Sequence, residues 1–450
     1  MKQPSLTAEP RELGFWMCTA LVVGNTIGIG IFMMPASLAP YGLNAVTAWV
    51  ITAIGCSFIG WTFAGLARVF PQDDGPYAYT FRAFGGATAY MVMWCYWVSV
   101  WVANAAIATG AVGYLTTLLP ALKSNPLWPP LTALGLVWFF VVINVRGVRT
   151  VGWLQVLTTV LKLLPMAAVI ALGIWQLITA PAAYTEHLPT TPATLGNVLS
   201  ASTTALFAML GIECATIPAG RVRDPGRTIP RATIIGTLLL ALICMCISIV
   251  PLLLIPQQEL ARSNAPFADL LTRMLGGRYG ELLAAFVVVS GMGALNGWTL
   301  IGGELTQSFA RHGSFPAALG KVNARAAPTR AFVLIGLVTS LMIVMNYSKS
   351  LVQGFTFLIV VVTAANLPIY FFCALAVVVL WRRGEIAHLG RRELSFVLAA
   401  LVAFAYSIWA FIGVGLESLL WAIALAAIGV PVYLWMRHAR GRTAELGQGA

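Results

Sequence analysis

Two ionisable residues lie inside long apolar runs of this 450-residue chain, where their side chains could do chemistry. Glu213 lies in LFAMLGIECATI, and Lys162 lies in LTTVLKLLPMAAVI. A charge near the centre of a bilayer is costly, so such residues usually serve a function. Glu213 could recognise a cationic ligand, or it could be a neutral hydrogen-bonded acid or the partner of Lys162. Lys162 could carry a coupled proton, tether backbone carbonyls or snorkel to the interface.

Glycines interrupt two apolar runs that lie five runs apart. Gly28 and Gly30 fall in GNTIGIGIF (24–32), and Gly211 falls in FAMLGIECATIPAG (207–220). Broken helices at corresponding positions of two halves are typical of a transporter site. Close packing of helices through small residues is the alternative explanation. A break at Gly28–Gly30 would free backbone N–H groups that suit a carboxylate.

Aromatic and small polar side chains occur in two further apolar runs. MWCYWVSVWVAN contains Tyr96, Ser99 and Asn104, whose hydroxyl and amide groups could line a cavity. Trp298 lies beside a glycine in GALNGWTLIGGELT. An indole face attracts an ammonium or guanidinium by about 0.5–2 kcal/mol. Most of the 15 tryptophans must instead face lipid or the membrane interface, which is the alternative for Trp298.

Composition identifies the elements that must position these side chains. The chain is 59% hydrophobic and only 9% charged, whereas a soluble domain is about 25% charged. Since one crossing takes about 20 apolar residues, we predict an all-α integral membrane protein with twelve transmembrane helices. The predicted spans start near residues 14, 44, 87, 128, 153, 197, 233, 280, 329, 354, 396 and 419.

The net charge of +12 has a topological explanation. With both termini in the cytoplasm, most of the lysines and arginines fall in cytoplasmic segments, as the positive-inside rule requires. We therefore expect no nucleic-acid partner. The first apolar run continues into further spans, so we expect it to be a working helix and not a cleaved signal peptide.

The residue inventory argues against other classes of membrane protein. The seven cysteines lie in apolar segments without metal-like spacing, and the four histidines lie in loops or the tail. Such thiols usually behave as small hydrophobes. We therefore expect no enzyme activity, no cofactor and no metal site. A channel would show charged rings or a carbonyl filter sequence, and the chain has neither.

Several motifs together resemble one known group of transporters. GNTIGIGIFMMPASLAPYG (24–42), GPYAYTFRAFG (75–85) and DPGRTIPRA (224–232) are similar to signatures of the amino acid–polyamine–organocation (APC) superfamily. The similarity extends from about residue 12 to 438. LGIECA, YWVSVWVAN and GWTLIGG make it closest to the basic amino acid/polyamine antiporters, above all those of the arginine/agmatine type. Lysine/cadaverine and ornithine/putrescine exchangers match nearly as well.

The resemblance implies a LeuT-like APC fold, with five-plus-five inverted repeats and two C-terminal helices, often as a homodimer in the cell inner (plasma) membrane. We expect a cytoplasmic N-terminus at 1–12, a transporter domain at 13–438 and a cytoplasmic tail at 439–450. Within the transporter domain, the inverted repeats cover about 13–178 and 197–381, and the extra helices cover about 396–437.

The resemblance also implies a substrate site. The substrate carboxylate and α-amino group would meet the segment Thr26, Gly28, Ile29 and Gly30. The side-chain cation would approach Ser99, Val100 and Asn104, with Trp298 stacked on it. The remaining implied residues are Phe207 and Leu210 over the substrate, Val361 nearby, and Tyr96 and Glu213 in a gate.

Three departures from the arginine exchangers bear on substrate and coupling. Ile29 stands where they have a serine, and Phe207 replaces a gating tryptophan. The position of Lys162 is apolar in those exchangers, but it is a lysine in several proton-coupled and sodium-independent amino acid transporters of the superfamily. Because Glu213 and Trp298 resemble the exchangers more than the importers, we expect exchange of a cationic amino acid for its decarboxylated amine, arginine/agmatine-like, with Glu213 as a pH-responsive group. The alternative is a proton-coupled amino acid or polyamine symporter that uses Lys162.

Overall fold

All regular elements in the described part of the chain are helices, which confirms the all-α prediction. The computed structural model describes residues 15–16, 19, 26–70, 75–146, 162–212, 225–325, 327–346, 348–386 and 392–448. The long helices are α3 (Asn44–Val69), α5 (Gly86–Leu118), α6 (Trp128–Val145), α8 (Leu163–Thr179), α11 (Pro225–Leu254), α14 (Gly277–Arg311), α15 (Thr329–Met345), α16 (Leu351–Arg382), α17 (Arg392–Ile412) and α18 (Leu416–Gln448).

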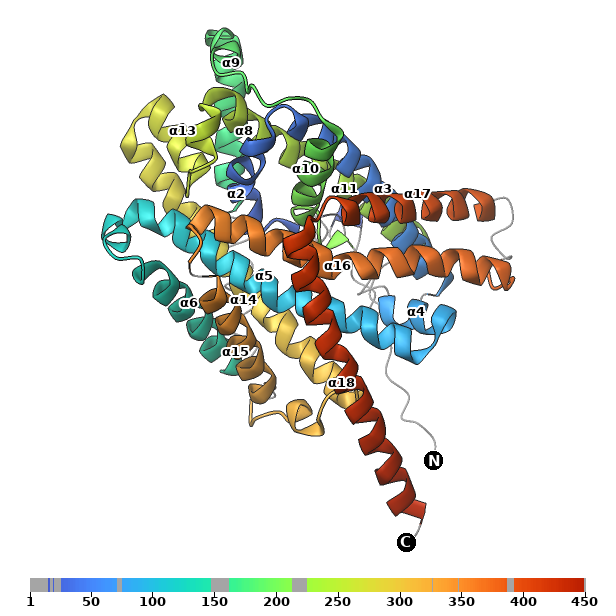
Figure 1. Ribbon diagram of the computed structural model, residues 1–450. Helices are drawn as coiled ribbons and strands as arrows, with labels where there is room; N and C mark the ends of the chain where they lie inside the picture. Colours follow the sequence, from blue (N-terminus) through green and yellow to red (C-terminus); the bar gives the residue numbers. More distant parts are fainter. Residues whose placement is uncertain are drawn as a thin grey trace.

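Shorter helices complete the architecture (Figure 1). They are α2 (Ile29–Leu38), α4 (Pro76–Phe84), α9 (Ala183–Glu186), α10 (Leu195–Phe207), α12 (Gln257–Leu260) and α13 (Pro266–Leu275), with 3-10 turns at Ala39–Tyr41, Pro120–Lys123 and Ala317–Gly320. The sequence predicts short helices near 179–196 and 256–279, and α9, α12 and α13 lie there.

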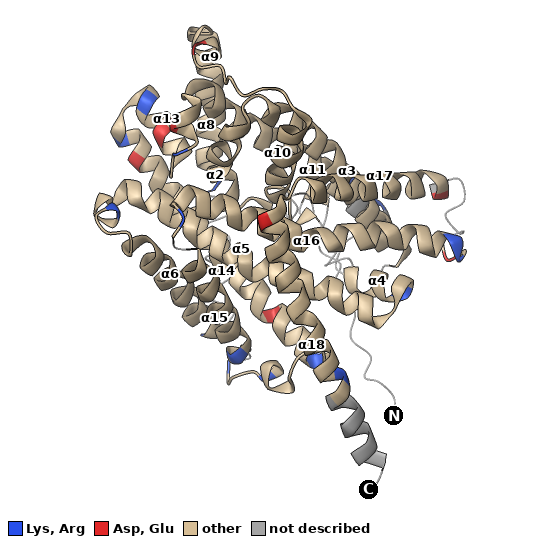
Figure 2. Cartoon of the chain, viewed as in Figure 1, with Lys and Arg blue, Asp and Glu red and all other residues tan. Residues whose placement is uncertain are grey.

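The helices have the length and composition of a multi-pass membrane protein. Among the described residues, eight are long and apolar enough to cross a bilayer, and three apolar helices are shorter. The starts of α3 and α15, at Asn44 and Thr329, match the predicted ones. Figure 2 shows most charged residues near helix ends and connections. The count of twelve spans and the inverted repeat stay predictions.

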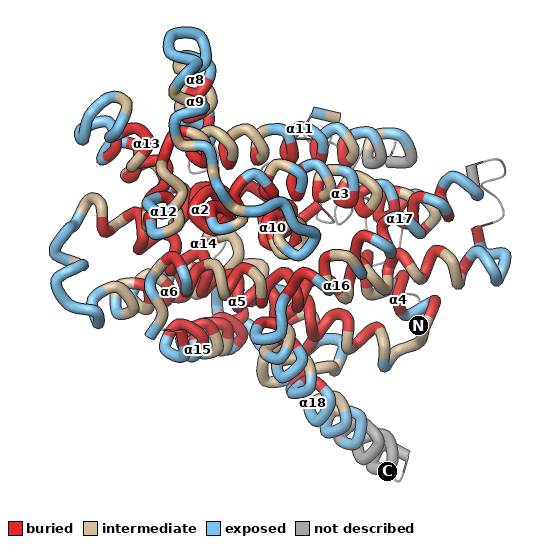
Figure 3. The backbone as a smooth tube through the Cα atoms, turned by 45° about the horizontal axis from the view of Figure 1, so that its top comes forward, coloured by how far each residue is buried: buried red, intermediate tan, exposed pale blue. Residues whose placement is uncertain are grey.

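Helices α5 and α16 form the centre of the molecule, where they pack against each other (Figures 1 and 3). In the most apolar 18-residue stretch of each helix, 94% of the residues of α5 are buried inside the protein but only 11% of those of α18. With 33 residues, α5 is about 50 Å long, which exceeds the ~30 Å hydrocarbon layer. A helix surrounded by protein can present polar side chains to neighbouring helices without exposing them to lipid.

The Tyr114 hydroxyl joins three elements at one end of the helix assembly. From α5 it donates a hydrogen bond to the Phe32 carbonyl of α2, at 2.8 Å. It also accepts one from the Phe267 N–H of α13, at 3.2 Å. Nearby, the Gln257 amide of α12 donates to the Ala39 carbonyl at 2.7 Å. These bonds fix α2, and with it the edge of the site, against the short helices.

Replacing Tyr114 by phenylalanine should therefore destabilise the fold. The change leaves the Phe32 carbonyl and the Phe267 N–H without this buried partner, and each loss costs about 1–3 kcal/mol. We expect a clearly lower melting temperature in detergent. Tyr279→Phe, at an exposed position of α14, is the matched control. Equal melting of the two variants would contradict the structural role of the Tyr114 hydroxyl.

Candidate functional site

Helix boundaries lie at both predicted glycine positions, and they face each other. Helix α2 begins at Ile29, after an extended Gly28 that provides no side-chain cap. Helix α10 ends at Phe207, and Gly211 beyond it has φ +103°, a conformation that favours glycine. A Cβ at Gly30 would lie 2.2 Å from Cε1 of Phe207. The close approach of α2 and α10 thus requires glycine at this position.

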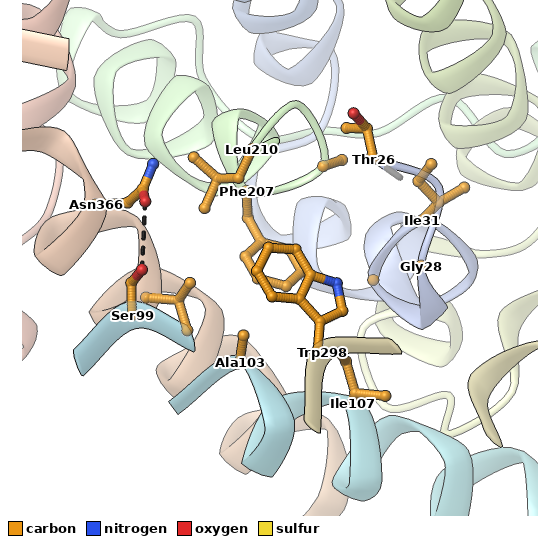
Figure 4. Close-up of a pocket in the computed structure, with 13 residues that line it drawn as sticks. Thr26, Gly28, Ile31, Ser99, Ala103, Ile107, Phe207, Leu210, Trp298 and Asn366 are labelled. Atoms are coloured by element: carbon orange, nitrogen blue, oxygen red, sulfur yellow. Dashed lines mark hydrogen bonds between the residues drawn. The ribbon is translucent and has the colours of Figure 1, made fainter. Parts of the chain in front are cut away.

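A cavity lies beside these two helix ends (Figure 4). Helices α2, α5, α10, α14 and α16 all contribute to its wall. The lining residues are Thr26, Gly28, Gly30, Ile31, Ser99, Ala103, Ile107, Phe207, Ala208, Leu210, Trp298, Val362 and Asn366.

The structure brings together seven of the thirteen predicted substrate-binding residues. Those in the lining are Thr26, Gly28, Gly30, Ser99, Phe207, Leu210 and Trp298. Those described but absent from the lining are Ile29, Tyr96, Val100, Asn104 and Val361. Glu213 lies outside the described residues. A substrate contact for any of these residues stays a prediction.

The rotation of each helix explains which predicted residues miss the cavity. On α5 the lining residues Ser99, Ala103 and Ile107 are spaced by four, so they share one face. Val100 is turned from that face by about 100° and packs against Gly302 of α14. Asn104 is 1% exposed, and neither atom of its amide has a hydrogen-bond partner among the described residues.

Ile29 also points away from the cavity. It packs against Gly110 of α5 and Gly291 of α14, where the absence of side chains leaves room for it. Its backbone remains at the start of α2. Backbone N–H groups at this end are therefore the available donors, whatever the side chain at position 29.

Lys162 forms a direct bond to the interrupted segment. Its Nζ donates to the Ile27 carbonyl at 2.9 Å, and the side chain is only 4% exposed. Ile27 lies just before α2, and Lys162 just before α8. This geometry agrees with the carbonyl tether that the sequence leaves open as one role of Lys162.

The two sides of the cavity offer different chemistry. In Figure 4, Thr26 and Gly28 lie on one side, and Ser99 and Asn366 on the other, with Phe207 and Trp298 between them. The first N–H groups of α2 have no acceptor within the helix, and together with the positive end of the helix dipole they favour an anion. None of the described lining residues is acidic. Among the described lining residues, neutral oxygens and aromatic faces are the groups that could hold a cation at the opposite side.

Six lining residues were not predicted: Ile31, Ala103, Ile107, Ala208, Val362 and Asn366. Only Asn366 carries a recognisable signal, because it is a polar residue in the apolar run VVTAANLPIY, two positions before Pro368. The others are apolar residues within apolar runs. Within the described residues, His, Cys, Asp and Glu do not gather into a group of three that could hold a metal.

Comparison with known proteins places these features in a wider context. A protein-family profile described as "Amino acid permease" matches residues 13–434. The cadaverine/lysine antiporter of Escherichia coli K12 is 31% identical over 348 residues, covering 76% of this chain and 77% of that protein. The putrescine transporter PotE of the same strain is 29% identical over 427 residues, covering 95% and 96%. PotE of Haemophilus influenzae is 28% identical over 428 residues, covering 95% and 98%.

Proposed function

Because the chain belongs to the amino acid permease family, we propose that it is a secondary transporter that exchanges a cationic amino acid for its decarboxylated amine. The resemblance to APC transporters of basic amino acids and polyamines is confirmed. Such proteins transport small molecules and are not enzymes. The arginine/agmatine pair is our first choice, and lysine/cadaverine and ornithine/putrescine are the related ones. The protein works by alternating access in the inner membrane. Both of its termini are cytoplasmic, and it assembles as a homodimer.

One observation carries this proposal: the cavity has an anion-favouring helix start on one side and uncharged, aromatic cation acceptors on the other. A basic amino acid has a carboxylate at one end and a cation at the other, so it matches both sides. Its decarboxylated amine keeps the cation and loses only the group that the start of α2 would bind. Two substrates that share the cation can thus compete for one cavity, which is what exchange needs.

The proposed binding mode gives roles to the lining residues. The segment Thr26–Gly30 binds the α-amino and carboxylate groups through its backbone. Phe207 and Leu210 cover the aliphatic stem, and Trp298 faces the distal cation. Tyr96 and Glu213 act in a gate, and Glu213 is the pH-responsive group. Val100, Asn104 and Val361 support the wall from positions beside the cavity.

The coupling mode depends on Lys162. Its bond to the Ile27 carbonyl favours a fixed cation that holds the interrupted segment in place, and this supports plain exchange. Proton symport would need Lys162 to release its proton and that bond during the cycle. Symport by Lys162 therefore remains the second candidate.

Counterflow in proteoliposomes tests the function. Vesicles are loaded with agmatine, cadaverine or putrescine, or left empty, and uptake of labelled arginine, lysine or ornithine is followed with and without an acid-outside gradient. Exchange predicts uptake only into loaded vesicles. Gradient-driven uptake into empty vesicles would establish symport instead. Uptake of none of these compounds would overturn the proposed substrate class.

Trp298→Leu should weaken substrate binding by roughly ten-fold, because leucine removes the aromatic face that attracts the cation. Trp298→Phe keeps a ring and should lose less. Isothermal calorimetry on the purified protein measures both changes. Equal affinity in the leucine variant and the parent would show that Trp298 only lines the cavity.

A further inference from the structure

The Asn366 amide of α16 is a buried polar group in which only one of the two polar atoms has a hydrogen-bond partner among the described residues. Its side chain lines the cavity and is 2% exposed. Its Oδ1 lies 3.2 Å from the Ser99 Oγ of α5, while its Nδ2 has no partner among the described residues. A buried amide nitrogen without a partner is uncommon and costs free energy. The group therefore requires an explanation.

The hydroxyl of Ser99 cannot satisfy both acceptors near it. Ser99 Oγ lies 2.7 Å from the Tyr96 carbonyl and 3.2 Å from Asn366 Oδ1. A serine hydroxyl carries one proton, and the shorter contact to Tyr96 takes it. The lone pairs of Ser99 then face Asn366. A half-turn of the Asn366 amide places its NH₂ on Ser99 as a donor and puts Oδ1 in the position that the unpartnered Nδ2 now holds.

We propose that Asn366, turned in this way, accepts a hydrogen bond from the distal cation of the substrate and thereby selects for a charged side chain. The inference rests on the proposed function. Figure 4 shows Asn366 on the side of the cavity away from Thr26 and Gly28, which is where a substrate anchored by its carboxylate extends its other end. The described lining provides no acid there, so among these residues a neutral oxygen held by Ser99 is the acceptor best suited to an ammonium or guanidinium.

The test compares ligands that differ in the distal cation alone. Lysine is paired with norleucine and arginine with citrulline, and each affinity is measured by competition against the labelled substrate that the parent protein transports. Asn366→Leu should reduce the preference for the charged member of a pair by about ten-fold. Lysine and cadaverine should lose affinity by the same factor, because they share the distal ammonium. Asn366→Asp keeps the oxygen and adds a charge, so it should increase the preference.

Two controls keep the outcomes distinct. Thr363→Val is the first control. Thr363 is as buried as Asn366 on the same helix but does not line the cavity, and its hydroxyl donates to the Ile359 carbonyl of that helix. This variant should leave the preference unchanged. If Asn366→Leu does not fold, Asn366→Asp and Ser99→Ala provide the test. Ser99→Ala should reduce the preference for the charged ligand by a smaller factor, about three-fold. An unchanged preference in the folded Asn366 variants overturns this inference alone. A parent protein that transports none of labelled arginine, lysine and ornithine overturns the proposed function instead.

Discussion

Lys162→Met is expected to abolish counterflow and gradient-driven uptake together. The methionine keeps most of the volume but removes the ammonium that bonds the Ile27 carbonyl at 2.9 Å. Hydrogen bonds of charged groups contribute about 1.5–3 kcal/mol, so the competent arrangement of the interrupted segment should become about ten- to a hundred-fold rarer. Proteoliposome counterflow measures the loss.

The pattern of loss also separates the two coupling modes. If Lys162 carries a proton in symport, its variant should lose accumulation driven by the gradient and retain counterflow between loaded sides. If it is a fixed cation, both activities should fall in parallel. Lys349→Met is a suitable control, because that lysine pairs at the surface with Glu417 and lies over the Phe357 ring, and surface pairs contribute little.

Gly30→Ala is the second change with a large expected effect. Its new Cβ would fall 2.2 Å from Phe207 Cε1, so the ring must swing into the cavity or α2 and α10 must separate. Overpacking of this kind costs about 1–3 kcal/mol, which corresponds to a loss of about five- to 150-fold in binding. Initial rates of exchange and ligand affinity should both report it.

A compensating substitution tests the cause. Phe207→Leu removes the ring atoms that the new Cβ meets, so the double variant Gly30→Ala/Phe207→Leu should recover part of the affinity that Gly30→Ala loses. Gly135→Ala in α6, where a Cβ meets nothing within 4 Å, should behave like the parent. A double variant no better than Gly30→Ala would mean that the contact with Phe207 is not what the glycine preserves.

The helices and their interruptions could be predicted because their causes are local. Apolar runs of about 20 residues must be helical in lipid, and this principle led to α3 and α15 within a residue. Gly28 and Gly211 predicted the breaks, because glycine tolerates the backbone conformations that a break requires. The short helix α13 lies in a mildly polar segment between two predicted spans, where a short helix was expected.

The rotation of the central helices could not be predicted in the same way. Helix α5 is apolar all round and buried on every face, so no polar stripe marks the side that faces the cavity. Ser99 and Val100 were therefore equally plausible as lining residues from the sequence, and only the packing of Val100 against Gly302 distinguishes them. Ala103 and Ile107 carry no chemical signal. Asn366 does carry such a signal, because it is a polar residue within an apolar run, as Glu213 is.

In the proposed binding mode, the two sides of the cavity differ in how readily evolution can change them. The donors at the start of α2 belong to the backbone, so any residue except proline supplies them and no single substitution removes the set. The acceptors on the other side are the side chains of Ser99 and Asn366, each open to replacement by one codon change. Descendants of this chain can therefore diverge in the distal group that they accept, while recognition of an amino acid's carboxylate persists unchanged.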